Sequence, residues 1–432
     1  MKNDLAEGLA GTPDSGLATF PDHVHWEGEG SSRIPFMAYT DEQVYKKELQ
    51  RFFYEKHWNY VGLEAEIPNK GDFIRTVIGE RSVVMVRSSE DEISVFENVC
   101  AHRGMAFVRE RHGNRKIFVC PYHQWNYTLD GSLKGVPFRR GVKQADGTVN
   151  GGMPADFDPA NNDAFKLKVA RRGGVVFASF DHDVESLEDF LGPTILGYFD
   201  RLFNGRKLKI LGYNRQRIPG NWKLMQENIK DPYHPGLLHT WFVTFGLWRA
   251  DNKSELRMDA HHRHAAMIST RGAAGAASQV TQVSSFKESM KLEDARFLDI
   301  VQEPWWGGPT AVMMTLFPSV ILQQQVNSVS TRHIQPRGHD SFDFVWTHFG
   351  FEDDTEEMTT RRLRQANLFG PAGFVSADDG EVIEMSQEGF ESKPFHRTLA
   401  ELGGRDATDT DHMVTETLIR GMYEYWRKTM ER

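Results

Sequence analysis

The residues of this chain best suited to bind a metal are two cysteines that each have a histidine close behind. Cys100 and Cys120 are the only cysteines among 432 residues, and His102 and His123 follow them in the stretches NVCAHRG and VCPYHQW. Thiolate and imidazole ligands together are typical of a tetrahedral zinc site, or of a two-iron cluster with cysteines on one iron and histidines on the other. In a third interpretation both cysteines are simply buried apolar residues, but their shared pattern favours a metal.

A second set of candidate ligands lies in the segment QENIKDPYHPGLLHTW, residues 226–241. Residues five positions apart in an ideal helix point about 140° away from each other, so His234 and His239 cannot bind one ion from a regular helix. Pro235 and Gly236 lie between them and predict a kink or wide turn that brings the two imidazoles together. Histidines beside a helix break are equally common without a metal, so both interpretations stay open for the pair alone.

A carboxylate would complete this second site. The segment GPAGFVSADDGEVIEMSQ places Asp378 and Asp379 after a glycine-rich turn, where paired acids usually face solvent or cap a helix. Two histidines and one carboxylate, however, form the facial triad of non-haem Fe(II) oxygenases, which leaves neighbouring coordination positions open. Asp231 stands three residues before His234 and is predicted to orient that imidazole by accepting its outer N–H.

The two patterns together resemble the large (α) subunits of Rieske non-haem iron ring-hydroxylating oxygenases. CAHRG followed by CPYHQW resembles the Rieske 2Fe-2S motif, and ENIKDPYH with its second histidine resembles the family pattern Glu-Asn-x-x-Asp-x-x-His-x-x-x-x-His. The resemblance covers nearly the whole chain. It implies the following ligands: Cys100 and Cys120 on one cluster iron, His102 and His123 on the other, and His234, His239 and Asp379 on a mononuclear Fe(2+), with Asp378 the weaker choice.

The resemblance also implies partners and an assembly. No Rossmann fingerprint is present, so electrons are expected from a ferredoxin and an NAD(P)H-dependent reductase. A trimer of α subunits with small β subunits (α3β3) is expected, in which Asp231 is catalytic because it bridges His234 and the cluster ligand His123 of a neighbouring chain. Two other classes remain open from the residues alone, namely a zinc-binding scaffold and an electron-transfer Rieske protein without oxygenase activity.

The segment NWKLMQENIKDPYHPGLLHTWFVTFGLWRADNKS is most similar to the salicylate and anthranilate branch of the family. That similarity implies hydroxylation of an ortho-substituted benzoate with O2. Among such substrates, 5-hydroxylation of salicylate is favoured. The alternative is cis-dihydroxylation of anthranilate, a halobenzoate or terephthalate.

Candidate substrate contacts lie in two places. The polar residues of VILQQQVNSVSTRH are predicted to line a pocket, with Gln323, Gln325 and Asn327 on one face of a strand. Arg332 suits a benzoate carboxylate through two parallel hydrogen bonds. Trp241 and Phe245, just after the histidines, are candidate pocket walls, although core packing explains aromatic residues equally well.

The elements that must position these residues lie in two regions with different sequence patterns. Residues 60–180 contain short runs rich in Val, Ile and Phe separated by Gly, Asn, Asp and Ser, which predicts a small all-β domain. We expect an α+β protein with an N-terminal helical segment at 1–57, the all-β Rieske domain at 58–165, and a larger catalytic domain at 166–432. The catalytic domain is predicted to be an antiparallel sheet with helices, on which the N-terminal helix at 40–58 packs.

Charge and hydropathy exclude some other functions. The net charge is −9, which argues against nucleic acid or an anionic membrane as a partner, because both select a basic surface. The sequence shows no run of about 18 apolar residues and no secretion signal. A cytoplasmic protein is therefore expected.

Overall fold

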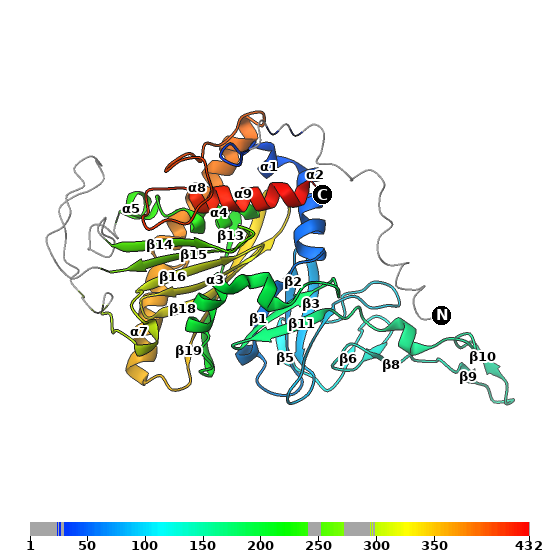
Figure 1. Ribbon diagram of the computed structural model, residues 1–432. Coiled ribbons are helices and arrows are strands. Elements are labelled where there is room, and N and C mark those ends of the chain that lie inside the picture. Colours follow the sequence, from blue (N-terminus) through cyan, green and yellow to red (C-terminus); the bar gives the residue numbers. More distant parts are fainter. Residues whose placement is uncertain are drawn as a thin grey trace.

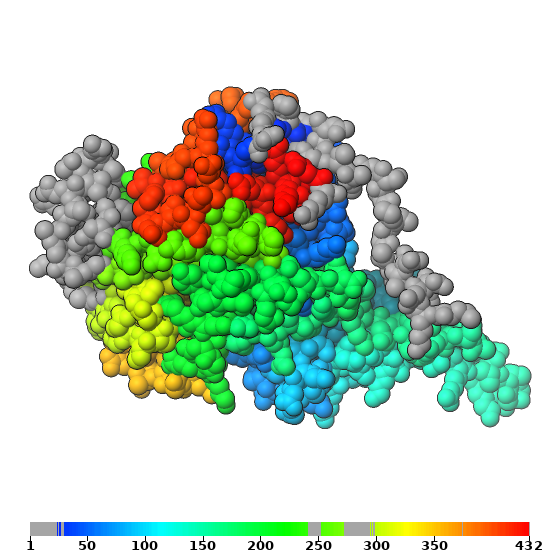
Figure 2. Space-filling view, viewed as in Figure 1, coloured from blue at the N-terminus to red at the C-terminus, as the bar shows by residue number. Residues whose placement is uncertain are grey.

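The computed structural model describes residues 24, 26, 30–240, 252–271, 294, 296 and 299–431. A small β-rich unit lies beside a larger sheet that is covered by helices (Figure 1). In the space-filling view of Figure 2 the residues coloured cyan to blue-green, which belong to the β-rich unit, protrude from one side of the molecule. Within the described ranges, no helix is long and apolar enough to cross a membrane.

Three small sheets and one hairpin build the β-rich unit. The sheets have the strand orders β4-β3-β2-β5, β6-β7-β8 and β1-β12-β11, and the hairpin joins β9 and β10. The strands are β1 (Asn59–Leu63), β2 (Asp72–Ile78), β3 (Arg81–Arg87), β4 (Ile93–Glu97), β5 (His112–Asn114), β6 (Phe118–Val119), β7 (Asn126–Tyr127), β8 (Leu133–Gly135), β9 (Val142–Lys143), β10 (Val149–Asn150), β11 (Lys168–Arg172) and β12 (Val175–Ser179).

The core of this unit encloses both cysteines. Cys100 and Cys120 belong to one apolar cluster with inward side chains of β2, β3, β4, β6, β7 and β8, among them Tyr127. The sequence predicts that the domain ends at residue 165. In the structure β1 pairs antiparallel with β12, so the strand pairing of this unit continues to residue 179.

The larger unit is a seven-stranded antiparallel sheet with the order β13-β19-β18-β17-β16-β15-β14. Its strands are β13 (Leu208–Pro219), β14 (Lys253–Met258), β15 (Ala265–Thr270), β16 (Ala311–Leu316), β17 (Val320–Gln325), β18 (Ser328–Pro336) and β19 (Ser341–Phe351). Every residue of β18 is buried, because helices cover the centre of the sheet. The α+β class predicted from the sequence is confirmed.

Helices hold the segments that carry the second candidate site. They are α1 (Met37–Thr40), α2 (Glu42–Glu48), α3 (Leu187–Leu202), α4 (Trp222–Lys230), α5 (Pro235–Leu238), α7 (Glu356–Phe369), α8 (Phe374–Ser392) and α9 (Thr417–Met430). A π-helical turn, η1 (Leu49–Tyr54), continues α2. Glu48 of α2 forms a buried ion pair with Lys223 of α4 at 2.7 Å and accepts a hydrogen bond from Trp426 of α9 at 2.7 Å. The N-terminal helices and the C-terminal helix thereby fix α4 from two sides.

Candidate metal centres

The two cysteine loops have the same backbone geometry. The N–H of Gly104 donates to the carbonyl of Cys100 (2.8 Å), and the N–H of Gln124 donates to the carbonyl of Cys120 (2.9 Å). The N–H of each cysteine donates in turn to the carbonyl five residues further on, at 2.9 and 2.8 Å. Gly104 and Gln124 have φ of 69° and 57°, the left-handed region that closes such tight loops. Each loop therefore presents its cysteine at the start of one repeated turn.

The four side chains form a site with a buried and an exposed end. Cys100 and Cys120 are each 2% exposed, whereas His102 is exposed and His123 is half-buried. The two imidazole rings lie 4.5 Å apart between centroids, and His102 stacks on the buried ring of Trp125 at 4.8 Å. Sulfur ligands on the core side and nitrogen ligands on the solvent side are the division that a Rieske cluster requires.

A single zinc ion fits this arrangement less well. Within the described part of the chain, three ligand atoms lie within 4.8 Å of one another only at His234, His239 and Asp379. The four side chains of the β-rich unit do not converge on one point in that way. A two-iron cluster spreads its ligands over two metals, so the residues present fit the 2Fe-2S group.

Tyr127 is a further contact that the sequence analysis did not single out. Its hydroxyl accepts from the N–H of Ala101 at 3.1 Å and lies 3.3 Å from the sulfur of Cys100 in hydrogen-bond geometry. A thiolate sulfur that ligates iron has no proton, so the hydroxyl would donate to it when the cluster is bound. We expect Tyr127→Phe to lower the reduction potential of the cluster by on the order of 50 mV, because the lost hydrogen bond stabilises the reduced form. Redox titration of the visible spectrum measures this, and an unchanged potential would rule out the hydrogen bond.

The segment that carries His234 and His239, the second set of candidate ligands, is a broken helix. Helix α4 ends at Lys230, Asp231 is its C-cap, and α5 begins at Pro235. His234 and His239 are the N-cap and C-cap of α5, which turns both imidazoles to one side. The sequence predicts a break at Pro235, but the helix stops before Asp231 and proline starts the next turn, where its fixed φ is favourable. Asp231 and His234 therefore do not share a helix face.

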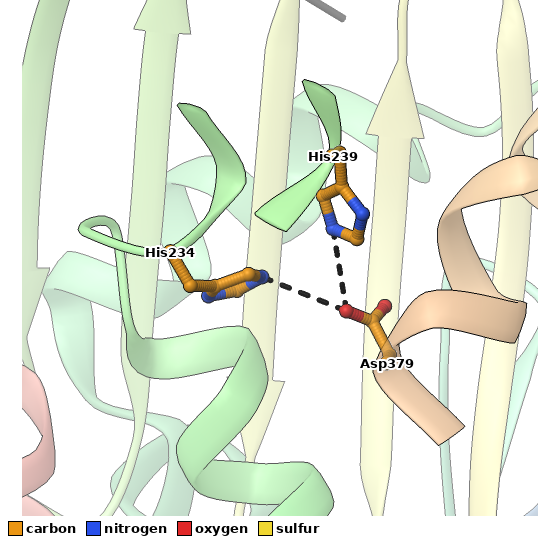
Figure 3. Close-up of side chains that lie close together, drawn as sticks. All are labelled: His234, His239 and Asp379. Atoms are coloured by element: carbon orange, nitrogen blue, oxygen red, sulfur yellow. Dashed lines mark ion pairs between the residues drawn. The ribbon is translucent and has the colours of Figure 1, made fainter. Parts of the chain in front are cut away.

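His234, His239 and Asp379 converge on one point (Figure 3). Oδ1 of Asp379 lies 3.6 Å from Nε2 of His234 and 3.3 Å from Nε2 of His239. Ligand atoms that bind one ion at about 2 Å and at right angles lie about 3 Å apart. The ligand atoms of the three residues all lie within 4.8 Å of one another, so together they could hold one cation.

The protonation tendencies of these residues also suit a cation. Burial raises the pKa of Asp379, but the hydrogen bond from His239 and the charge of His234 outweigh burial, so that the pKa lies below its usual value. Burial lowers the pKa of His239, and the carboxylates of Asp379 and Asp378 outweigh it, so that this pKa is raised. A buried carboxylate that stays ionised beside two imidazoles is a donor set for a positive ion.

Each of the three residues has an outer polar neighbour. Nδ2 of Asn228 donates to Oδ1 of Asp379 at 3.2 Å, and Nδ1 of His239 lies 3.1 Å from Oδ2 of Asp378 in hydrogen-bond geometry. Nδ1 of His234 lies 3.4 Å from Oδ2 of Asp231. The sequence patterns predict no role for Asn228, although its place one turn before Asp231 is a usable signal, and they predict Asp378 only as a weaker ligand.

A cavity opens beside the triad, between α4, α8 and the large sheet. Its wall is mostly apolar, with Met267, Met313 and Val375, and it contains Gln325 and Arg332. An apolar wall with few polar groups is typical of a small-molecule site. Two of the residues predicted to contact substrate thus line the cavity.

The other predicted substrate residues have different positions. Gln323 is buried and donates to Oε1 of Gln325 at 2.6 Å, so it supports a residue of the cavity wall. Asn327 is not among the residues that line the cavity. This residue lies in the turn after β17, where its amide donates to the carbonyl of Val301 (2.7 Å) and to Glu303 (3.0 Å), because strand alternation stops at Gln325. Trp241 and Phe245 lie outside the described residues.

Arg332 is a buried cation at the cavity wall. Its side chain is packed over the ring of Trp346 at 4.0 Å, the residue is 3% exposed, and Nε has no hydrogen-bond partner among the described residues. Burial lowers the pKa of Arg332 to about 9 although the charge of Asp379 opposes the shift, so the guanidinium stays charged at neutral pH. A buried charge without a paired carboxylate destabilises the folded protein. An anionic ligand in the cavity would compensate this charge.

Two family models match the chain. The model for the Rieske 2Fe-2S domain matches residues 57–146, and the model for the ring hydroxylating alpha subunit (catalytic domain) matches residues 204–432. These matches cover the segments that carry the cysteine loops and the triad.

Named relatives extend over almost the whole chain. The large oxygenase component of salicylate 5-hydroxylase from Ralstonia sp. is 77% identical over 95% of this chain and 97% of its own length. The large subunit of anthranilate 1,2-dioxygenase from Burkholderia cepacia is 38% identical, with 94% and 95% covered. Naphthalene 1,2-dioxygenase from Rhodococcus sp. has the same fold, with a TM-score of 0.76 at 23% identity over 92% of this chain and 94% of that one.

These matches decide between the three classes that the residues alone left open. They confirm an aromatic ring-hydroxylating oxygenase and decide against a zinc scaffold and against a pure electron-transfer protein. The chain belongs to the Rieske ring-hydroxylating oxygenases, as an α subunit whose family uses a 2Fe-2S cluster and a mononuclear iron.

Proposed function

We propose that this chain is the oxygenase component that hydroxylates salicylate at ring position 5. The observation that carries the proposal is Arg332, a buried guanidinium in the cavity beside the triad and without a carboxylate partner among the described residues. The 77% identity to a salicylate 5-hydroxylase large component supports salicylate over other aromatic acids.

The proposed ligands follow the sequence patterns. Cys100, Cys120, His102 and His123 would hold the 2Fe-2S cluster, and His234, His239 and Asp379 would hold the ferrous ion. When bound, the cluster supplies one-electron storage and the ferrous ion supplies O2 activation. In the overall reaction one oxygen atom enters a ring C–H bond, and the other becomes water with two electrons and two protons.

The protein residues orient the reactants. Arg332 would bind the substrate carboxylate with two parallel N–H donors, which fixes the ring plane relative to the triad. Gln325, held by Gln323, adds a polar contact on the same wall. Asn228 holds the oxygen of Asp379 that faces both imidazoles, and this leaves the cavity side of the triad open for O2 and substrate.

Electron delivery is proposed to run between neighbouring subunits of an α3β3 ring, supplied by a ferredoxin and an NAD(P)H-dependent reductase. The β6-β7-β8 sheet lies beside the cysteine loops, and the short helix α5 lies beside the triad. In Figure 1 these two elements are on opposite sides of the molecule. His102 is exposed and His123 half-buried, and the side chain of Asp231 is 20% exposed. The histidines of the cluster loops and Asp231 are therefore both accessible for a contact between two chains.

Arg332→Met tests the carboxylate anchor. We expect the KM for salicylate to rise about 100-fold, because removal of one partner of a buried hydrogen-bonded ion pair costs about 2–5 kcal/mol. Arg332→Lys keeps the charge without the planar pair of donors and should raise KM by a smaller factor, about 10-fold. Steady-state kinetics measure both values, and equal KM values for the three proteins would exclude Arg332 as the anchor.

Product analysis tests the proposed function itself. The purified component is supplied with a surrogate ferredoxin and reductase, 18O2, and salicylate, anthranilate or benzoate in parallel. The proposal predicts 2,5-dihydroxybenzoate with one 18O atom as the main product, from salicylate. A preferred product from anthranilate or benzoate that carries two 18O atoms would instead establish the cis-dihydroxylating alternative.

A further inference from the structure

The outer nitrogens of the two triad imidazoles have unequal contacts within the chain. Nδ1 of His239 and Oδ2 of Asp378 form a hydrogen bond of 3.1 Å. Nδ1 of His234 lies 3.4 Å from Oδ2 of Asp231 but is buried without a hydrogen-bond partner among the described residues. The two aspartates therefore do not perform the same task.

Asp378 and Asp379 reach opposite nitrogens of one ring. Both lie on α8, where consecutive residues point about 100° apart. Oδ1 of Asp379 lies 3.3 Å from Nε2 of His239, while Oδ2 of Asp378 lies on the Nδ1 side. Figure 3 shows Nε2 of His239 directed at Asp379 and the other ring nitrogen directed away from it. The side chain of Asp379 is 4% exposed and that of Asp378 is 37% exposed. Asp379 is therefore the buried member of the triad, and Asp378 lies outside it on the solvent side of His239.

An ionised carboxylate can only accept a hydrogen bond. An ion can bind Nε2, the atom that faces the triad, only through a free lone pair, so the ring proton must then lie on Nδ1, where the carboxylate of Asp378 is placed to accept it. A hydrogen bond of this kind also fixes the rotation of the ring.

We infer that Asp378 is a positioning residue for the iron site, which holds the tautomer and orientation of His239 so that Nε2 can bind the ion shared with His234 and Asp379. This inference rests on the proposed ligand set. Asp231 makes no hydrogen bond to an imidazole among the described residues, so it remains available for the proposed contact with a neighbouring subunit.

The test compares iron binding in holoenzyme variants that keep the full chain and the cluster. Asp378→Ala removes the acceptor, Asp378→Asn keeps an acceptor oxygen without the charge, and Glu381→Ala removes an exposed charge on the same helix. Fe(II) alone is the probe. Its affinity at the mononuclear site is measured by competition with a chromogenic Fe(II) chelator, while the visible spectrum reports the cluster.

We expect Asp378→Ala to weaken Fe(II) binding about 10- to 100-fold, as loss of an outer histidine partner does at other metal sites. Asp378→Asn should recover part of this loss, and the cluster spectrum should not change. The inference is overturned if Asp378→Ala binds Fe(II) as tightly as the parent, or if Glu381→Ala weakens binding equally. Asp379→Ala separates the two proposals, because retained iron in that variant would refute the ligand set, not only the role of Asp378.

Discussion

Replacing Asp379 with alanine is expected to remove the mononuclear iron and to lower hydroxylation at least about 1,000-fold. The carboxylate lies 3.3 and 3.6 Å from the two imidazole nitrogens and would be the one anionic ligand of the proposed triad. Loss of a ligand costs more than the about 10- to 100-fold loss of affinity that follows removal of an outer partner. Iron content per chain and product formation from salicylate measure the effect.

The cluster provides an internal control for this variant. Cys100 and Cys120 lie in the core of the β-rich unit, apart from α8, so the visible spectrum of Asp379→Ala should match that of the parent. Glu384→Ala, which removes an exposed carboxylate from the same helix, should keep its iron. An Asp379→Ala protein that still contains one mononuclear iron and hydroxylates salicylate would show that the triad is not the metal site.

Asp231→Asn is expected to lower hydroxylation about 100-fold or more while both metal centres remain assembled. The side chain keeps its size but loses the charge that lies 3.4 Å from Nδ1 of His234. Because Asp231 makes no hydrogen bond to His234 within the chain, iron binding should depend on it less than on Asp378. The defect should appear as slow oxidation of the reduced cluster by O2 in the presence of salicylate, measured by stopped-flow absorbance.

Mixed assemblies distinguish transfer between chains from transfer within one chain. The Asp231→Asn chain retains its cluster, and a Cys120→Ser chain lacks the cluster but keeps Asp231 and the triad. Neither protein alone should hydroxylate salicylate at a significant rate. Co-assembly of the two should restore part of the activity if electrons pass from the cluster of one chain to the iron of the next, whereas no recovery would place the transfer within a single chain.

Local sequence patterns were sufficient for the fold class and for grouping His234, His239 and Asp379 as candidate metal ligands. The cysteine-histidine spacings and the Pro-Gly pair between His234 and His239 have direct structural consequences, and these were found. The position of the helix break was missed, because the end of α4 is set by capping at Asp231 and by packing against α2 and α9. The β-rich unit continues to residue 179 because β1 pairs with β12 across more than 110 residues, and no local pattern encodes such a pairing.

Contacts that depend on tertiary structure were predicted less well. Strand alternation predicts Gln325 and Asn327 on one face. Gln325 lies in the cavity wall, whereas Asn327 lies beyond β17, which ends two residues earlier. Tyr127 and Asn228 act on atoms from distant parts of the chain, and their residue types alone do not indicate a partner. Asp378 was ambiguous for a related reason: adjacent aspartates on a helix differ only in direction, which sequence alone does not give.

The proposed chain stores an electron at one metal centre and hydroxylates an aromatic acid at the other. The most direct measurement is a single turnover of the fully reduced holoenzyme with salicylate and 18O2, without ferredoxin or reductase, followed by rapid quench and mass spectrometry. We expect 2,5-dihydroxybenzoate with one 18O atom, formed together with oxidation of the cluster. Oxidation of the cluster without hydroxylated product, or product without oxidation of the cluster, would contradict it.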